Sequence, residues 1–172
     1  MSSIDLFLLG FLNKKSISAY DLAKFIEENQ LNQMIKISTP AVYKNLIRLK
    51  EKRYLSSKKV QSGNSSQKVI YSITNKGGKY FHSLMVKQSK KDFLIYFDFN
   101  SFIVNLDQVD EKKMNELLDN FQEVLLKKKN LYSGYKNKFN SAPYAAKSII
   151  NQLYDVNDLI LKWLDVYKKN KK

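Results

Sequence analysis

The segment 38–55 constrains the fold more than any other part of the chain, because it reads as a helix with one apolar and one basic face. Ser38 or Thr39 can cap its start, and Pro40 suits a first helical turn, where the missing N–H costs nothing. Apolar side chains recur at helical spacing and form a stripe for burial: Val42, Leu46 and Leu49. The opposite face carries small, polar and basic side chains: Ala41, Lys44, Asn45, Arg48 and Lys52. Such side chains can reach base edges and phosphates, so the pattern predicts a DNA-reading helix.

The charge of the chain agrees with binding to a nucleic acid. The formal net charge is +14, from 30 Lys and Arg against 16 Asp and Glu, and a domain this basic usually meets a polyanion. Residues 1–88 hold 15 basic and 5 acidic side chains, whereas residues 89–172 hold 15 and 11, so the first half should bind the polyanion. Arg48 and Arg53 are the only arginines. Few donors are thus available for bidentate recognition of guanine, which favours readout of A·T pairs or of groove shape.

The residue types exclude several other classes of protein. The chain has no cysteine, so disulfides and thiolate zinc sites are excluded, and His82 is the only histidine. No metal cluster, phosphate-cradling glycine loop or nucleophile–base pair can be assembled, so we expect neither an enzyme nor a cofactor. The apolar start of the chain carries Asp5 and lacks a basic leader, so it reads as a core helix and not as a signal peptide. No segment is long enough to span a membrane, and a cytoplasmic protein is expected.

Three helices and a hairpin are predicted in the first half. Residues 4–12 form an apolar helix, Ser18 opens a second, and the basic segment described above is the third. Two short β-tolerant runs follow at 56–61 and 67–73, and the Gly63-Asn64 pair between them favours a turn. This order is the winged helix-turn-helix arrangement, in which the third helix enters the major groove and the hairpin lies along the backbone.

The second half is predicted to consist of helices, beginning with an aromatic one at about 91–104. Two apolar stripes then repeat in steps of three and four residues, from Met114 to Phe139 and from Ala146 to Tyr167. Such stripes must be buried, and the nearest source of surface is a second copy of the chain. The residues expected in this dimer contact are Leu118, Phe121, Leu125, Ile149, Leu153, Val156, Ile160 and Trp163.

The predicted fold class is therefore mostly α with a small β-hairpin, in two domains. Residues 1–88 are expected to form a winged helix-turn-helix DNA-binding domain. Residues 89–172 are expected to form a helical dimerisation domain.

Several motifs in the first half recur in a known family. They are the apolar first helix, the opening Ser18-Ala-Tyr-Asp-Leu22, Tyr43 with Arg48-Leu49 in the third helix, and the wing end Tyr71-Ser-Ile-Thr-Asn-Lys-Gly77. On these motifs, residues 4–87 resemble the PadR family of bacterial transcriptional regulators, a winged helix-turn-helix group. Three features depart from the family pattern. Ala19 replaces the usual glycine, Arg53 stands where the third helix commonly ends in glycine, and the wing lacks a frequent Gly-Arg-Pro.

The C-terminal half is similar to the helical domain of the virulence-activator type of this family, notably at Leu161-Lys-Trp163-Leu164. The resemblance implies a homodimer clasped through these helices, regulation by repression, and phenolic or drug-like inducers. Phe93, Tyr96 and Phe97 are candidates for a pocket that binds a small aromatic effector. Core and dimer packing is the simpler explanation of this aromatic cluster.

The predicted function is a sequence-specific transcriptional regulator, a dimeric repressor on an inverted-repeat operator in double-stranded DNA. Lys44 or Asn45 should reach base edges, Arg48 should bind phosphate, and Lys68 is the best candidate on the wing. By the resemblance, Tyr43 also binds phosphate. The complete set of expected DNA contacts is Ser38, Thr39, Ala41, Tyr43, Lys44, Asn45, Arg48, Lys58, Asn64, Ser66, Gln67 and Lys68.

Two alternatives remain open. A non-specific architectural or RNA-binding protein would bind unrelated duplexes with near-equal affinity and leave no footprint. A protein-interaction adaptor with a degenerate winged helix would show no salt-dependent DNA binding at all.

Overall fold

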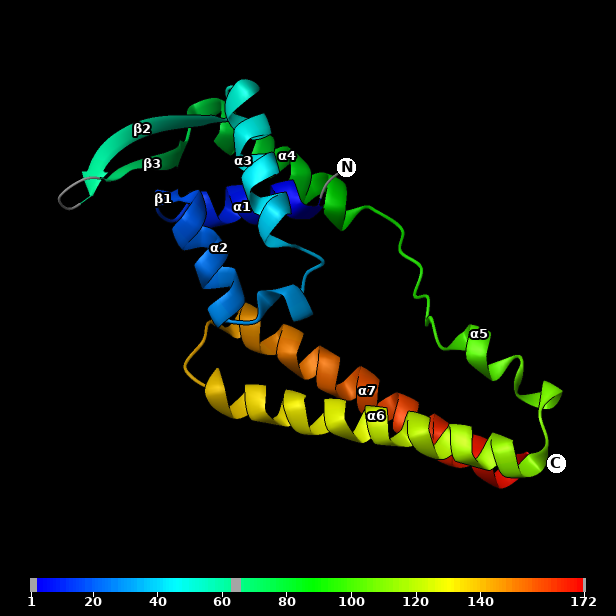
Figure 1. The fold of residues 1–172 in the computed structure, drawn as a ribbon. Helices are drawn as coiled ribbons and strands as arrows, with labels where there is room; N and C mark the ends of the chain where they lie inside the picture. Colours follow the sequence, from blue (N-terminus) through cyan, green and yellow to red (C-terminus); the bar gives the residue numbers. More distant parts are fainter. Residues whose placement is uncertain (1–2, 63–65, 172) are drawn as a thin grey trace. The chain divides into compact units, whose positions relative to one another are not determined.

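The computed structural model of the chain describes residues 3–62 and 66–171. They form two compact units, and the chain passes from the first to the second between Phe93 and Leu94 (Figure 1). Helices predominate and the only sheet among the described residues is small and antiparallel, which confirms the predicted fold class. The domain boundary expected after residue 88 falls near the end of the last helix of the first unit.

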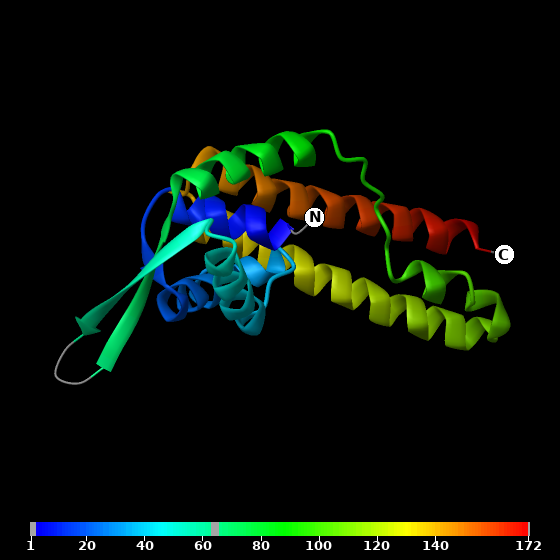
Figure 2. The ribbon, with the colours of Figure 1, turned by 90° about the horizontal axis from the view of Figure 1, so that it is seen from above.

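The first unit is a winged helix. Its elements in chain order are α1 (Ser3–Leu12), β1 (Ile17–Ser18), α2 (Ala19–Glu28), the 3₁₀ turn η1 (Leu31–Gln33), α3 (Thr39–Glu51), β2 (Leu55–Ser62), β3 (Ser66–Ile73) and α4 (Asn75–Ser89). The sheet has the strand order β1-β3-β2, and β2 and β3 extend away from the helices of this unit as a long ribbon (Figure 2). The three predicted helices and the hairpin are confirmed, whereas the turn expected at Gly63-Asn64 lies outside the described residues.

The sheet contains one strand that the sequence does not reveal. β1 is only two residues long, and its Ile17 and Ser18 pair with Tyr71 and Ile70 of β3. A strand this short shows no alternating pattern, because alternation needs at least four residues to be recognised. Its pairing depends on a partner strand far away in the sequence.

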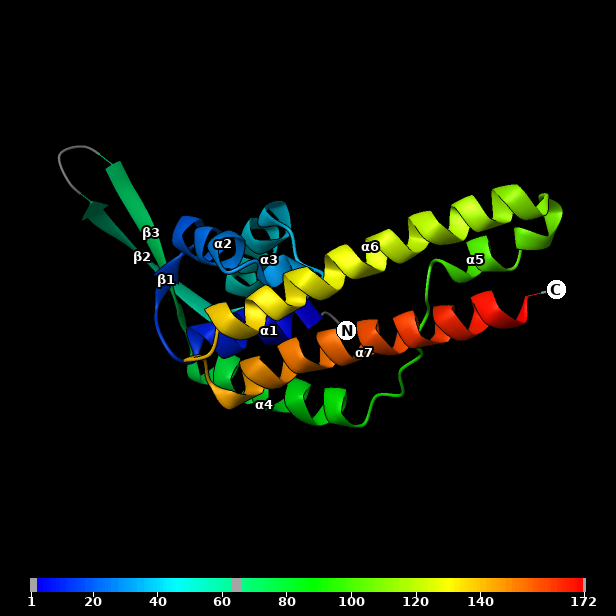
Figure 3. The same cartoon turned by 90° about the horizontal axis from the view of Figure 1, so that it is seen from below.

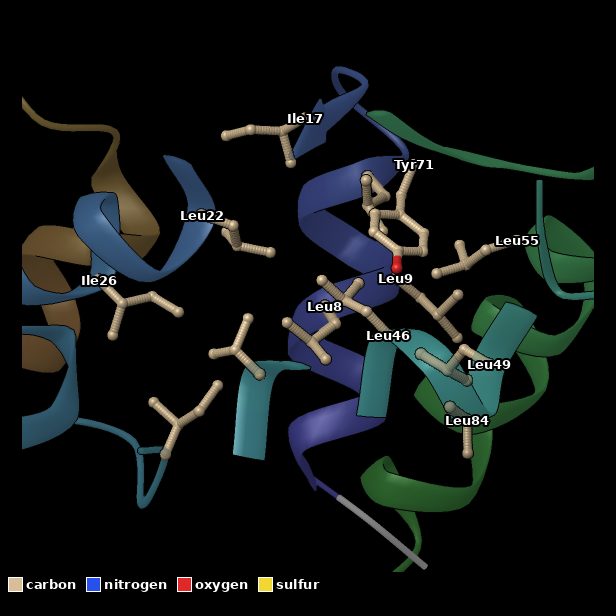
Figure 4. Packing of buried hydrophobic residues seen from close by; sticks show 13 residues of the cluster. Leu8, Leu9, Ile17, Leu22, Ile26, Leu46, Leu49, Leu55, Tyr71 and Leu84 are labelled. Atoms are coloured by element: carbon tan, nitrogen blue, oxygen red, sulfur yellow. The ribbon is translucent and has the colours of Figure 1, made fainter. Parts of the chain in front are cut away.

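One apolar core joins the helices and the sheet of this unit. The side chains that meet there are Leu8 and Leu9 of α1, Leu22 and Ile26 of α2, Leu46 and Leu49 of α3, Leu55 and Tyr71 of the sheet, and Leu84 of α4 (Figure 4). Leu8, Leu46 and Leu49 are completely buried. The stripe predicted in the segment 38–55 is thus the inner face of α3, and this fixes which of its side chains point outward.

The end of α3 is a Schellman motif in which a non-glycine residue takes the left-handed position. The Arg53 N–H donates to the Lys50 carbonyl at 2.8 Å, and the Tyr54 N–H donates to the Leu49 carbonyl at 2.9 Å. Both bonds need the φ of 61° found at Arg53. This conformation favours glycine, because a Cβ there approaches the following carbonyl oxygen. Arginine at this position therefore carries a conformational cost.

We expect Arg53→Gly to stabilise the protein by about 1 kcal/mol, because glycine takes the left-handed conformation without this cost. Urea denaturation measures the change. The matched control is Lys52→Gly, because Lys52 has a φ of −77° and gains nothing from glycine. This control should lose stability instead, and a destabilised Arg53→Gly variant would contradict the argument.

The start of α4 lies against the end of α3. The Thr74 hydroxyl caps α4 by accepting the Gly77 N–H at 3.0 Å, while the Thr74 N–H donates to the Tyr54 carbonyl at 3.1 Å. A Cβ on Gly77 would overlap the Tyr54 carbonyl oxygen and lie 2.8 Å from Cγ1 of Ile73, whereas Gly78 has open space around it. The Gly77 of the wing motif is therefore required by the close approach of two backbones.

The second unit is a helical hairpin preceded by two short helical turns. Its elements are α5 (Asn100–Ile103), the 3₁₀ turn η2 (Leu106–Gln108), α6 (Glu111–Lys138) and α7 (Tyr144–Asn170). The expected aromatic helix at 91–104 is wrong, because only the single turn α5 forms within an otherwise irregular segment. α6 and α7 run side by side in opposite directions (Figure 3).

Within the described part of the chain, no helix has both the length and the apolar character needed to cross a membrane.

The buried face of α6 contains residues of the first predicted stripe, whereas the buried face of α7 is offset by one residue from the second predicted stripe. Leu118 and Leu125 of α6 share a buried cluster with Leu161 and Leu164 of α7. Part of the first stripe is therefore covered within the chain, which corrects the expectation that a second copy must cover it. The short connection at 139–143 lets α7 fold back along α6.

The residues expected in the dimer contact consequently divide into three groups. Leu118 and Leu125 are buried inside the hairpin, whereas Ile149 and Trp163 are each 38% exposed. The remaining four are partly buried: Phe121, Leu153, Val156 and Ile160.

Candidate functional site

The outward face of α3 is the first candidate surface. The Ser38 hydroxyl caps the helix by accepting the Ala41 N–H at 3.4 Å. Because the apolar stripe faces the core, the opposite side of the helix is exposed: Pro40, Tyr43, Lys44, Ile47, Lys50 and Glu51. Of the residues expected to contact bases or phosphates, Tyr43 and Lys44 lie on this face. Lys44 and Lys50 make it basic, and Tyr43 is 39% exposed.

Two residues expected on this face are bound by groups of the same unit. The Arg48 guanidinium donates to the carboxylate of Asp5 in α1, and Asp5 is 3% exposed. The same Arg48 nitrogen donates to Oδ1 of Asn45 at 2.8 Å, and Nδ2 of Asn45 donates to the Ala41 carbonyl at 2.7 Å. The bond between Arg48 and Asp5 connects α3 to α1, and the other two lie within α3. A buried carboxylate thus already balances the charge of Arg48 in the free protein, and its contact with phosphate stays a prediction.

The first turn of α3 is also anchored from inside the unit. The Thr39 hydroxyl donates to the carboxylate of Glu27 in α2. Ala41, which was expected on the outward face, is only partly exposed. α3 is thus connected to α1 and to α2, which orients its outward face as part of a rigid unit.

The wing presents a second basic surface, and part of its charge is paired. Nζ of Lys68 lies 2.5 Å from the Asp21 carboxylate, and the Ser18 hydroxyl donates to the same carboxylate oxygen at 2.8 Å. The Lys68 ammonium, and after it the Ser18 hydroxyl, lower the pKa of Asp21 below its usual range. Asp21 therefore stays ionised beside Lys68 at neutral pH.

The remaining wing residues differ in what surrounds them. Lys58 and Gln67 are exposed. Lys58 pairs with Ile70 and Val60 pairs with Lys68, so Lys58 and Lys68 lie on the same face of the ribbon. Asn64 and the side chain of Ser66 lie outside the described residues.

Two residues on the outward face of α3, Ile47 and Lys50, were not among the DNA contacts predicted from the sequence. Ile47 is 50% exposed. The polar residues of the helix had suggested a face centred on Asn45 and Arg48. A helical wheel drawn opposite the stripe of Val42, Leu46 and Leu49 would have found Ile47.

The second unit contains a cavity of about 380 Å³. It is lined by aromatic and aliphatic side chains and a few polar ones: Tyr96, Phe97, Asp98, Phe99, Phe121, Val124, Leu125, Lys128, Tyr132, Leu153, Val156, Asn157 and Ile160. Asn157 is 4% exposed and donates to the Leu125 carbonyl at 3.0 Å. Tyr96 and Phe97, two of the three residues expected in an effector pocket, line this cavity, but Phe93 is 76% exposed and belongs to the first unit.

Comparison with known proteins gives one family match and several structural matches. The sequence of residues 8–83 matches the model of the transcriptional regulator PadR-like family. Among curated protein sequences no match was found.

Solved structures resemble the chain over nearly its whole length. Bacillus subtilis PadR in complex with operator DNA is 16% identical, with a TM-score of 0.84 over 96% of this chain and 97% of that one. PadR in complex with p-coumaric acid is 13% identical, with a TM-score of 0.80 over 100% and 99%. The Vibrio cholerae virulence activator AphA is 16% identical, with a TM-score of 0.71 over 95% and 94%. At these identities the likeness shows a common fold.

Proposed function

We propose that this chain, which belongs through residues 8–83 to the PadR-like family of transcriptional regulators, is a homodimeric repressor of an inverted-repeat operator in the cytoplasm. The observation that carries this proposal is the outward face of α3. It combines a capped helix start with exposed Tyr43, Lys44 and Lys50, on a helix whose inner face is completely packed. That geometry suits insertion into a major groove, with the ribbon of β2 and β3 along the backbone. The operator-bound structure of B. subtilis PadR supports the same use of the fold.

The test is a selection of bound duplexes from a random pool by the purified protein. We expect an enriched inverted repeat whose half-sites are about one helical turn, roughly 34 Å, apart. Equal retention of all duplexes would replace the proposal with a non-specific architectural role. Absence of salt-dependent binding would replace it with the adaptor role.

Variants on the two surfaces should separate base reading from backbone binding. Lys44→Ala should flatten the sequence preference, because Lys44 lies at the centre of the outward face of α3. Lys58→Ala should weaken all duplexes alike and reduce the slope of log affinity against log salt by about one. Lys68→Ala should change this slope less, because Asp21 already balances Lys68 in the free protein. Fluorescence anisotropy at several salt concentrations measures all three, and equal loss of preference in Lys44→Ala and Lys58→Ala would contradict this division.

The exposed apolar side chains of α7 support a homodimer. Leu159 and Val166 are 64% and 58% exposed, and they lie on the side of α7 opposite the buried Leu161 and Leu164. Trp163 lies beside them on the same helix face. An exposed apolar stripe of this kind, from Leu159 to Val166, is suited to a symmetric contact with its copy.

Replacing Leu159 and Val166 together with glutamate should convert the dimer into a monomer, because two charges would then face the apolar stripe of the partner. Sedimentation velocity measures the mass, and circular dichroism should show unchanged helicity because both positions are exposed. Lys169→Glu, at an exposed polar position of α7, is the control and should leave the dimer intact. A double variant that remains dimeric would place the contact elsewhere.

The aromatic cavity of the second unit supports a small aromatic acid as the effector. Tyr96, Phe97 and Phe99 offer ring faces, and Lys128 adds one cation for a carboxylate. B. subtilis PadR has been solved with p-coumaric acid, which serves as the probe. Adding it should release the selected operator, and unchanged operator affinity would remove the effector from the proposal.

A further inference from the structure

Ile47 is an exposed apolar side chain at the centre of a surface that otherwise suits polar contacts. It lies one turn after Tyr43 and Lys44 and one turn before Lys50 and Glu51, and it is 50% exposed. It is not among the side chains packed against the core of the unit. Its position on α3 would bring it against base edges whenever this helix lies in a major groove.

The side chains of α3 that could read guanine and adenine are already engaged in hydrogen bonds within the unit. Guanine is most often read by a bidentate arginine, but Arg48 donates to Asp5, and Arg53 lies beyond the helix end. Adenine is most often read by asparagine or glutamine. Both ends of the Asn45 amide are already engaged, one by Arg48 and the other by the Ala41 carbonyl. The outward face therefore retains Tyr43, Lys44 and Lys50 as polar side chains and Ile47 as the apolar side chain between them.

Among the four bases, only thymine presents a methyl group in the major groove. We propose that Ile47 is a specificity-determining residue that packs against the C5-methyl group of one thymine in each half-site. Lys44 precedes Ile47 by three residues on the same helix face, so the two side chains read neighbouring base pairs. This inference rests on the proposed function, and it names the base that the outward face of α3 prefers.

The experiment removes the methyl group without changing any hydrogen-bonding group. Each thymine of the selected operator half-site is replaced in turn by deoxyuridine, and affinity is measured with the full-length protein. We expect the replacement to weaken binding at one position of the half-site. The loss in affinity should be about fourfold for each methyl group contacted, because burying one methylene-sized group contributes about this much. Cytosine at this position should bind more weakly than 5-methylcytosine, because the latter restores the methyl group.

Two variants show whether Ile47 makes this contact. In Ile47→Ala, thymine and deoxyuridine operators should bind equally well. In Met85→Ala, which removes an equally exposed apolar side chain from α4, the preference for thymine should persist. A structural effect of Ile47→Ala would weaken both operators alike and would not remove the difference between them.

The outcomes separate the two proposals. If the selection enriches an inverted repeat but no deoxyuridine replacement weakens binding, or Ile47→Ala keeps the preference for thymine, the assignment of Ile47 is overturned and the regulator stands. If no duplex is bound in a salt-dependent way, both proposals fail.

Discussion

Gly77→Ala should destabilise the winged-helix unit by about 3 kcal/mol, whereas Gly78→Ala should be neutral or stabilising by up to about 1 kcal/mol. A methyl group on Gly77 would overlap the Tyr54 carbonyl oxygen, and the crowded atoms belong to the backbone and cannot rotate away. Relief requires α4 to shift away from the end of α3, which would break the Thr74 cap. At Gly78 the added Cβ meets open space, and alanine favours the helix more than glycine does.

Urea denaturation of the two variants measures the difference. Because the glycines are adjacent, helix propensity and solvent composition affect both alike, and only the contact with Tyr54 distinguishes them. Equal stability of the two variants would show that the close approach is not required. A loss at Gly77 alone would explain physically why this glycine belongs to the wing motif.

Asp5→Ala should lower the free energy of unfolding by about 2–3 kcal/mol. The Arg48 guanidinium would lose the buried carboxylate that accepts its hydrogen bond, and it would be left partly desolvated. The Arg48 side chain is 33% exposed, so water can replace some of the lost interaction and the effect stays below that of a completely buried pair. Chemical denaturation measures the change.

A double replacement tests whether the loss comes from the unpaired charge. Asp5→Leu combined with Arg48→Met removes both charges and keeps apolar volume, so it should be less destabilising than the sum of the two single variants. Additive losses would contradict the pairing. The single Arg48→Met variant should also release Asn45 to change partners, and a changed base preference in the operator selection would reveal this.

The sequence alone predicted the features that depend on neighbouring residues. The recurrence of Val42, Leu46 and Leu49 predicted the inner face of α3, and Ser38 predicted its start. The two short β-tolerant runs on either side of a turn signal predicted β2 and β3. These features could be predicted because helix and strand periodicity and capping are decided within a few residues of the chain.

The partners of the polar side chains could not be predicted in the same way. Arg48 and Asn45 looked like free polar groups of a basic face, because nothing near them in the sequence shows that Asp5 lies beside the helix. The two apolar stripes looked unpartnered because their periodicity does not say which surface covers them. In the tertiary structure, Leu118 and Leu125 of the first stripe pack against Leu161 and Leu164 of α7, which the second predicted stripe did not include.

The sequence by itself thus determined that the chain is a winged helix with a basic outward face on α3, because periodicity and charge are properties of local sequence. Only the tertiary structure decided which side chains of α3 are exposed. The packing of α1 against α3 brings Asp5 to Arg48 and leaves Lys44, Ile47 and Lys50 exposed. That contact joins residues far apart in the chain, and its formation depends on the packing of the whole core and not on any local pattern.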